Sequence, residues 1–197
     1  MAISVLMVAY AAVYAIATFA AFHRKSVWDS PTSTLTELHD ADNFVNGAVG
    51  VTSMLVLAIA ILLTVWSARV VVNARAQGRR VSGLAAGGWW IPIAWFVVPF
   101  VQLRRAVDGR GATSALALWQ ALFIVGFGVC RAIELAVRPD FDRFDTAQHV
   151  SDDLRNQGFA FLATTVVVAA LAVSAIAAMR SSDEVTTTGR SPAPSAA

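Results

Sequence analysis

The chain alternates between long apolar stretches and short polar connectors. Five stretches contain no Asp, Glu, Lys or Arg, and they are 22, 25, 23, 20 and 24 residues long. They cover residues 1–22, 44–68, 81–103, 111–130 and 156–179. A helix that crosses a bilayer needs about 20 consecutive apolar residues. The pattern therefore predicts an all-α integral membrane protein, a bundle of four or five hydrophobic helices.

Polar signals at the ends of these stretches predict where the helices begin and stop. Thr34 and Glu37 have the spacing of a capping box, so a helix is expected to start near Leu35 and to continue until Gly78. Thr113 and Ser114 predict the start of the fourth span, and Ser151, followed by two aspartates, predicts the start of the last helix.

The predicted organisation is a single membrane domain over residues 1–180, followed by a tail. Its hydrophobic segments lie at about 1–22, 44–68, 81–103, 114–137 and 156–179. Residues 181–197 are polar, contain two prolines and show no apolar period, so we expect a disordered C-terminal tail.

The third segment decides between four and five spans. Pro92 and Pro99 lie seven residues apart, and each removes a backbone hydrogen bond, so this segment is expected to be kinked or re-entrant. The connectors on either side of it, 69–80 and 104–110, are both rich in arginine, which favours the cytoplasmic side. A re-entrant segment keeps both connectors inside, whereas a tilted third span separates them; the amino terminus is cytoplasmic in either arrangement.

Composition narrows the class of protein. The chain is 57% hydrophobic and 14% charged, which excludes a soluble enzyme fold. Its formal net charge of +2, without a polybasic arm, gives no reason to expect a nucleic acid partner. Arginine outnumbers lysine fourteen to one, and alanine is abundant, a composition typical of GC-rich bacterial genomes. We therefore expect a multi-pass protein of the bacterial plasma membrane.

One stretch of about 40 residues carries a family resemblance. It reads W-S-A-R-V-V-V-N after residue 65 and G-G-W-W-I-P-I-A-W-F-V-V-P-F after residue 86. This resembles the bacterial membrane family called domain of unknown function 4328. The matching residues are Trp66, Arg69, Asn73, Gly88, Trp89, Trp90, Pro92, Ala94 and Pro99, whereas Trp95 and Phe100 depart from the family's pattern. The resemblance implies a multi-pass inner-membrane protein and implies no activity.

The residues of this stretch form the first candidate site, for lipid or a protein partner. Arg69 and Asn73 share one helix face, and they could meet Trp89 and Trp90 or hold a lipid phosphate, since a guanidinium and an amide donate several hydrogen bonds. Pro92 and Pro99 belong to the same candidate site. The alternative is that Arg69 only anchors the helix at the cytoplasmic surface while Asn73 bonds backbone freed by the prolines.

A second candidate is an intramembrane ion pair. Arg131 and Glu134 stand three residues apart near the end of the fourth helix, and charges inside a membrane often mark a site. The alternative is a self-neutralising pair that reaches the outer interface.

Metal, cofactor and catalytic motifs are weak or absent in the sequence. The two acidic regions expected outside hold His39, Asp40, Asp42, His149, Asp152 and Asp153, but without a recognised metal-binding spacing. No nucleophile elbow, phosphate loop or dinucleotide fingerprint occurs. No catalytic residue, metal or cofactor is therefore assigned.

The function that this sequence favours is interaction without catalysis. We expect the protein to act through membrane lipids, especially anionic lipid, or through a membrane-protein partner or a second copy of itself. The alternative is a small transporter or channel with a path at the proline-broken third segment. A path would need polar side chains through several spans, and the spans offer few.

Overall fold

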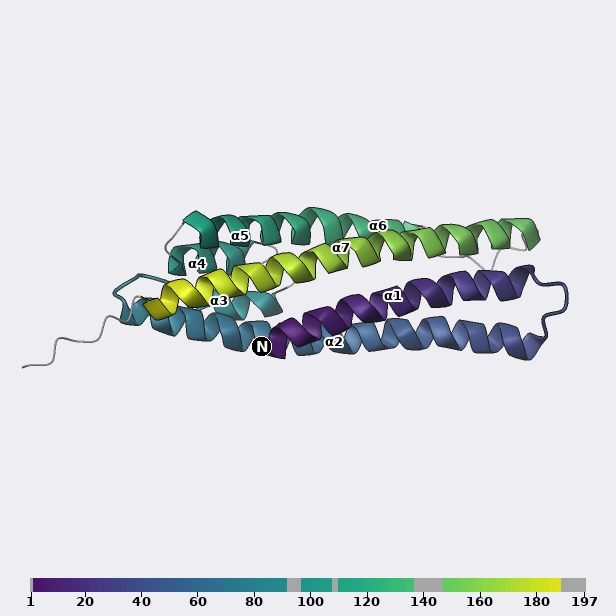
Figure 1. Ribbon diagram of the computed structural model, residues 1–197, viewed down its shortest axis with the longest axis horizontal. Helices are drawn as coiled ribbons and strands as arrows, with labels where there is room; N and C mark the ends of the chain where they lie inside the picture. Colours follow the sequence, from purple (N-terminus) through teal and green to yellow (C-terminus); the bar gives the residue numbers. More distant parts are fainter. Residues whose placement is uncertain (1, 92–96, 108–109, 137–146, 189–197) are drawn as a thin grey trace, which may run out of the picture. The chain divides into compact units, whose positions relative to one another are not determined.

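The computed structural model describes residues 2–91, 97–107, 110–136 and 147–188. These residues are almost entirely helical, and the described part of the chain contains no strand. Figure 1 shows the elements in order. They are α1 (Ala2–Asp29), α2 (Leu35–Ala76), α3 (Leu84–Gly87), η1 (Gly88–Trp90), α4 (Val98–Ala106), α5 (Arg110–Ala121), η3 (Leu122–Phe127), α6 (Gly128–Ala136) and α7 (Ala147–Thr188).

Among the described residues, four helices are long enough and apolar enough to cross a membrane. They cover Ala2–Asp29, Leu35–Ala76, Gly111–Cys130 and Gln148–Asp183. This confirms the predicted all-helical class, with helices that have the length and composition of membrane spans. The third hydrophobic segment is not among these four, because its described residues form only the short elements α3, η1 and α4.

The start of α2 confirms the predicted capping box. The Thr34 amide donates to Glu37 Oε2 over 2.7 Å, and the Glu37 amide donates back to Thr34 Oγ1 over 3.3 Å. The helix ends at Ala76, two residues before the predicted stop, and Gly78 then adopts a φ of 80°. A left-handed glycine just past the last turn lets the chain leave the helix while the final carbonyls stay bonded.

Three predicted helix ends are wrong. The fourth helix begins at Arg110, before the expected Thr113–Ser114 cap, and α7 begins at Ala147, four residues before Ser151. The helix α7 also continues through Thr188, so the disordered tail cannot begin at Ser181. Ser181 and Ser182 donate to the carbonyls of Ala177 and Ala178, so both hydroxyls are satisfied within the helix itself.

The chain divides into two compact units. Unit 1 comprises residues 1–58 and 125–170, and unit 2 comprises residues 59–124 and 171–197. The helices α2 and α7 and the π-helical turn η3 each contribute residues to both units.

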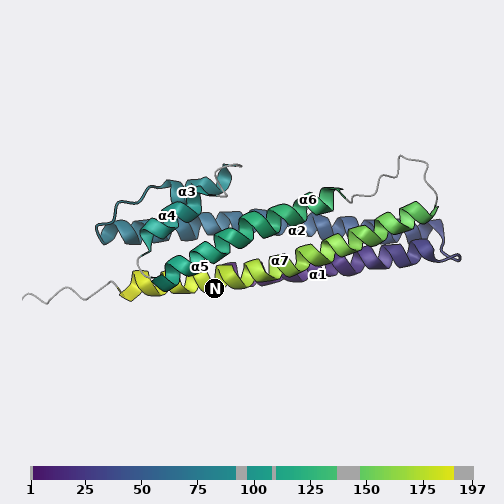
Figure 2. The ribbon, with the colours of Figure 1, turned by 90° about the horizontal axis from the view of Figure 1, so that it is seen from above.

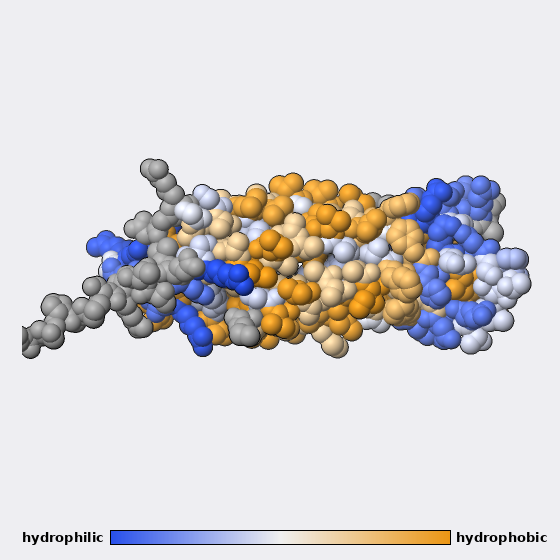
Figure 3. Space-filling model, viewed as in Figure 1, coloured by the Kyte–Doolittle hydropathy of each residue, from blue (hydrophilic) through white to orange (hydrophobic). Residues whose placement is uncertain are grey.

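Unit 1 packs α1 against the first part of α2 and the first part of α7. Its core consists of small and aromatic side chains: Tyr14, Ala17, Ala21, Ala48, Phe161 and Val168. Close contact is required at Gly158, where a Cβ would lie 2.8 Å from the Phe22 ring. Small residues at helix contacts allow backbones to approach closely, which is how helices associate in membranes. Figure 3 shows hydrophilic side chains gathered where α1 ends and α2 begins.

Unit 2 contains the three short elements, packed on α5 and on the second part of α2. In both ribbon views α3 and α4 lie side by side (Figures 1 and 2). Pro99 occupies the first turn of α4, where its missing N–H leaves no helical hydrogen bond unmade. Thus Pro99 starts a helix rather than kinking one, and Pro92 lies outside the described residues.

Candidate functional site

An aromatic cluster forms the centre of unit 2. The indole of Trp89 stacks on Trp119 with ring centroids 5.9 Å apart, and both rings contact Phe100 edge-on at 5.5 and 4.9 Å. Trp66 joins the cluster through Trp119 at 6.4 Å. Edge-to-face and offset stacked pairs are the favoured arrangements of aromatic rings. Side chains from α2, η1, α4 and α5 are thereby fixed together.

The two adjacent tryptophans have different surroundings. Trp89 is buried, and its indole N–H donates to the hydroxyl of Ser67 over 3.0 Å. Trp90 is 51% exposed, and its indole N–H donates to Thr64 over 2.8 Å. Both hydroxyls belong to α2 and stand three residues apart, one turn of the helix. The tandem tryptophans therefore hold η1 on one side of α2.

Arg69 and Asn73 do not supply these bonds. Arg69 is exposed, Asn73 is half-buried, and neither side chain has a hydrogen-bond partner among the described residues. The groups that bond the two tryptophans are the hydroxyls of Ser67 and Thr64. The sequence reasoning missed both hydroxyls, since serine and threonine inside a membrane helix usually bond their own backbone.

Arginines connect the two ends of the segment that follows α2. Arg75 Nε donates to the Val81 carbonyl over 2.9 Å, and Arg79 donates to the Ala106 carbonyl over 2.7 Å. The Ser82 amide donates to Gln102 Oε1 over 3.3 Å. The beginning of this segment, near residue 81, thus lies beside its end, near residue 106.

The remaining arginines of unit 2 differ in exposure. Arg104 donates to Gln120 over 2.7 Å, and its Nε is buried without a partner among the described residues. Arg69, Arg80 and Arg105 are exposed and donate no hydrogen bond to the described part of the chain. These last three guanidinium groups are free to bind an anion.

The two units carry opposite net charges. Unit 1 contains six Lys and Arg against ten Asp and Glu, a net charge of −4. Unit 2 contains nine arginines against three Asp and Glu, a net charge of +6. The arginines are therefore concentrated where the aromatic cluster lies.

A buried arginine joins three helices of unit 1. Arg24 of α1 is 8% exposed; it pairs with Asp42 of α2 over 3.2 Å and donates to Gln157 of α7. A buried guanidinium requires such partners, because an unpaired buried charge is costly. The sequence did not indicate this role, because Arg24 and Lys25 follow the first apolar stretch directly, where basic residues usually face water.

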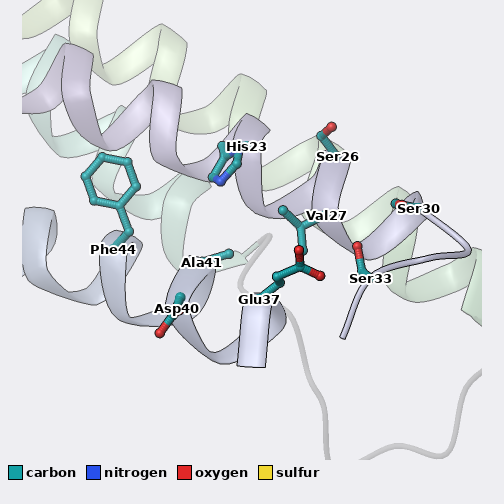
Figure 4. Close-up of a pocket in the computed structure, with 9 residues that line it drawn as sticks. All are labelled: His23, Ser26, Val27, Ser30, Ser33, Glu37, Asp40, Ala41 and Phe44. Atoms are coloured by element: carbon teal, nitrogen blue, oxygen red, sulfur yellow. The ribbon is translucent and has the colours of Figure 1, made fainter. Parts of the chain in front are cut away.

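Unit 1 also contains a pocket between α1 and α2, with a volume of about 440 Å³. Its lining residues are His23, Ser26, Val27, Ser30, Ser33, Glu37, Asp40, Ala41 and Phe44. Figure 4 shows α1 and α2 on either side of the pocket, the Glu37 side chain extending toward Val27, and Asp40 at the rim. Of the lining residues, only Asp40 is among the His and Asp side chains that the sequence analysis considered, without assigning a metal site.

The described structure does not test the candidate ion pair. Arg131 and Glu134 belong to the backbone of α6, but their side chains lie outside the described residues. Among the residues that the structure describes, no three His, Cys, Asp or Glu side chains are grouped to hold a metal ion.

Comparison with known proteins adds no functional assignment. No protein-family model, curated protein or solved structure matches this chain. The resemblance to the domain of unknown function 4328 family thus stays a prediction from the residues quoted above.

Proposed function

We propose that this protein is a four-span protein of the bacterial plasma membrane that binds anionic lipid at a basic inner face. It acts by interaction and not by catalysis, and the bound lipid stabilises its assembly with a membrane-protein partner or a second copy. The proposal rests on one observation. Exposed arginines lie on both sides of the third hydrophobic segment, and a hydrogen bond from Arg79 to Ala106 holds the two ends of that segment together.

The short elements of unit 2 support a re-entrant third segment. The helix α4 has nine residues and a length of about 14 Å, whereas the hydrocarbon core is about 30 Å thick. The bond from Arg79 to Ala106 joins the two ends of the segment. A segment whose two ends are bonded together enters and leaves the membrane on the same side. Both arginine-rich connectors then lie on the same side of the membrane.

The charge distribution supports the orientation. Cytoplasmic connectors carry an excess of Lys and Arg, so the connectors of unit 2 are assigned to the inside. The turn between α1 and α2, with the acidic helix ends on either side of it, then lies outside, and the amino terminus, at the other end of α1, is cytoplasmic. With four spans the carboxyl terminus is cytoplasmic too.

The exposed groups of unit 2 have the chemistry of a lipid headgroup site. Arg69, Arg80 and Arg105 offer guanidinium groups, which bind phosphate oxygens in a planar, two-pronged geometry. Trp90 and Leu84 are half exposed on the same short segment, and amphipathic indoles favour the membrane interface. Guanidinium groups beside interfacial apolar side chains match a phosphate beside its acyl chains.

The test is lipid retention by the Arg69→Gln, Arg80→Gln double variant. Each basic residue near an anionic surface contributes about 1 kcal/mol at low salt, so losing two weakens lipid binding by roughly thirtyfold. Native mass spectrometry of the full chain, purified in mild detergent, should show loss of bound phosphatidylglycerol and unchanged membrane insertion.

A matched control removes the same charge from unit 1. Lys25→Gln with Arg155→Gln breaks two ion pairs, with Asp29 and Asp152, and should leave phosphatidylglycerol bound. Equal lipid content in wild type and in the unit 2 variant would contradict the lipid proposal. Equal loss in both variants would contradict its location.

The transport alternative has less support. Several hydroxyls of the spans bond their own helix: Thr52 donates to the Val49 carbonyl and Ser174 to the Leu171 carbonyl. A hydroxyl bonded in this way has its donor occupied and offers only its oxygen to a polar path. Interaction therefore remains the better-supported proposal.

A further inference from the structure

We propose that the lipid bound at the basic face of unit 2 is cardiolipin, a lipid whose headgroup contains two phosphodiesters. This inference rests on the proposed function, because it names the class of anionic lipid that the same arginines select. The argument starts from the way the fold brings Arg80 and Arg105 together, and then considers their charge and the apolar side chains near them.

Two hydrogen bonds hold the ends of the third hydrophobic segment beside each other. Arg79 donates to the Ala106 carbonyl over 2.7 Å, and the Ser82 amide donates to Gln102 Oε1 over 3.3 Å. The earlier residue of one bond pairs with the later residue at the other end, so the two lengths of chain run past each other in opposite directions. The positions between the two bonds are therefore neighbours in space.

Arg80 and Arg105 both lie between these bonds. Each belongs to a consecutive pair of arginines, 79–80 and 104–105. Arg79 and Arg104 donate within the protein. Arg80 and Arg105 are exposed and have no hydrogen-bond partner among the described residues. One arginine of each pair thus builds the structure, and the other is left free on adjacent lengths of chain.

No described carboxylate neutralises the two free arginines. Asp183 accepts the indole N–H of Trp66 over 3.3 Å, at the aromatic cluster. The side chains of the other two carboxylates of unit 2, Asp108 and Glu184, lie outside the described residues. Two like charges held near each other repel, and a bound anion of matching charge relieves the repulsion. The arrangement therefore favours a ligand with two negative charges.

Two phosphates match two guanidinium groups better than one phosphate does. A guanidinium binds a phosphate through two parallel N–H···O bonds. A phosphodiester carries one negative charge, so phosphatidylglycerol satisfies one arginine of the two. Cardiolipin carries two phosphodiesters on one glycerol. Once the first is bound, the second contact is intramolecular and costs less entropy than binding a second lipid.

Apolar side chains on the same segment favour a lipid over a soluble compound with two phosphates. Leu84 and Trp90 are half exposed and follow Arg80 closely in the chain. An indole with one polar edge favours the interface between headgroups and acyl chains. Acyl chains attached to the bound phosphates would cover these side chains, whereas a soluble ligand would leave them in water.

The experiment measures the lipid preference of the full chain. The protein is reconstituted in nanodiscs that contain cardiolipin and phosphatidylglycerol in equal molar amounts, and native mass spectrometry in mild detergent identifies the lipid that stays bound. The second contact contributes about 1 kcal/mol, or about fivefold in affinity. Because cardiolipin also offers two phosphates, about twofold is added by number alone, and we expect wild type to prefer cardiolipin roughly tenfold.

The diagnostic variant is Arg105→Gln, which removes one of the two free arginines. Its preference for cardiolipin should fall to about the twofold value expected from number alone, and phosphatidylglycerol should still bind at Arg80. The matched control is Arg69→Gln, which removes the same charge from α2, outside the two bonded lengths of chain. This control should weaken the binding of both lipids together and keep the preference near its wild-type value.

The outcomes separate this inference from the proposed function. Retention of neither anionic lipid by wild type would overturn both. Retention of the two lipids in proportion to their phosphates would leave the proposed function standing and overturn the cardiolipin inference.

The variants exclude other causes of a preference. A preference that persists in Arg105→Gln would come from the four acyl chains of cardiolipin and would overturn the inference, as would an equal loss of preference in Arg69→Gln. Phosphatidic acid, added in the same molar amount, tests for a single doubly charged phosphate, and its retention at the level of cardiolipin would overturn the assignment of two phosphates. Loss of the preference in Arg105→Gln alone supports the inference.

Discussion

At the scale of single residues, the difference between Trp89 and Trp90 is set by their surroundings. Both donate an indole N–H to a hydroxyl of α2, but Trp89 is buried whereas Trp90 is half exposed. A buried donor that loses its acceptor has no water to replace it, whereas an exposed donor does. The two hydroxyls should therefore differ in their effect on stability.

Replacing Ser67 by alanine should destabilise the protein by about 1–3 kcal/mol, because the buried Trp89 N–H is left unbonded. Thr64→Val is the matched control, since the exposed Trp90 N–H can bond water or a lipid headgroup, and we expect a loss below about 0.5 kcal/mol. Thermal unfolding in detergent measures both. Equal losses in the two variants would show that burial does not separate the two bonds.

At the scale of elements, the return of the segment after α2 depends on a close approach between η1 and α4. A Cβ on Gly88 would lie 3.0 Å from Cδ and Cγ of Pro99, whereas a Cβ on the neighbouring Gly87 would meet nothing within 4 Å. Neither side of the Gly88 contact can yield easily, because proline is a rigid ring and η1 is held by Trp89.

Gly88→Ala should therefore destabilise unit 2 by about 1–3 kcal/mol through overpacking. Gly87→Ala adds the same methyl group at the preceding residue, where it meets no other atom within 4 Å. This variant should be neutral, or slightly stabilising, because alanine favours helix. Thermal unfolding compares the two, with quenching of tryptophan fluorescence as a reporter on the aromatic cluster. Similar behaviour of both variants would mean that η1 and α4 are not in close contact.

At the scale of the whole molecule, the separation of charge between the two units predicts the topology. Cysteines can be introduced as Ser33→Cys, Gln77→Cys and Gly109→Cys. The single native cysteine, Cys130, is buried, and it is replaced by alanine so that the reagent reports only on the introduced positions. In intact cells a membrane-impermeant thiol reagent should label position 33 and leave positions 77 and 109 unlabelled. Lysed cells should label all three.

Each possible failure identifies a specific error. Labelling at position 109 with protection at position 77 would mean five spans and an extracellular tail. Labelling at position 77 would reverse the orientation. Either result would also remove the basic inner face from which the lipid proposal is argued.

Several features of this protein follow from local sequence alone. The four long apolar helices are set by run length, since a backbone buried in lipid must satisfy its hydrogen bonds internally. The start of α2 at Leu35 follows from Thr34 and Glu37, which bond each other within one turn. The concentration of arginines in the second half of α2 and beyond is visible in the sequence too. These features depend on neighbours a few residues apart.

Tertiary structure decided the features that depend on distant partners. The sequence left open whether Arg69 and Asn73 meet the tryptophans or only anchor α2, whereas the structure shows that Ser67 and Thr64 accept the two indole N–H groups. The extension of α7 beyond Ser181 accompanies a bond from Trp66 to Asp183, 117 residues apart. The burial of Arg24 arises where α1, α2 and α7 meet, and the pocket at Glu37 arises where α1 meets α2. Helical periodicity fixes which residues share a face, but only packing fixes what that face contacts.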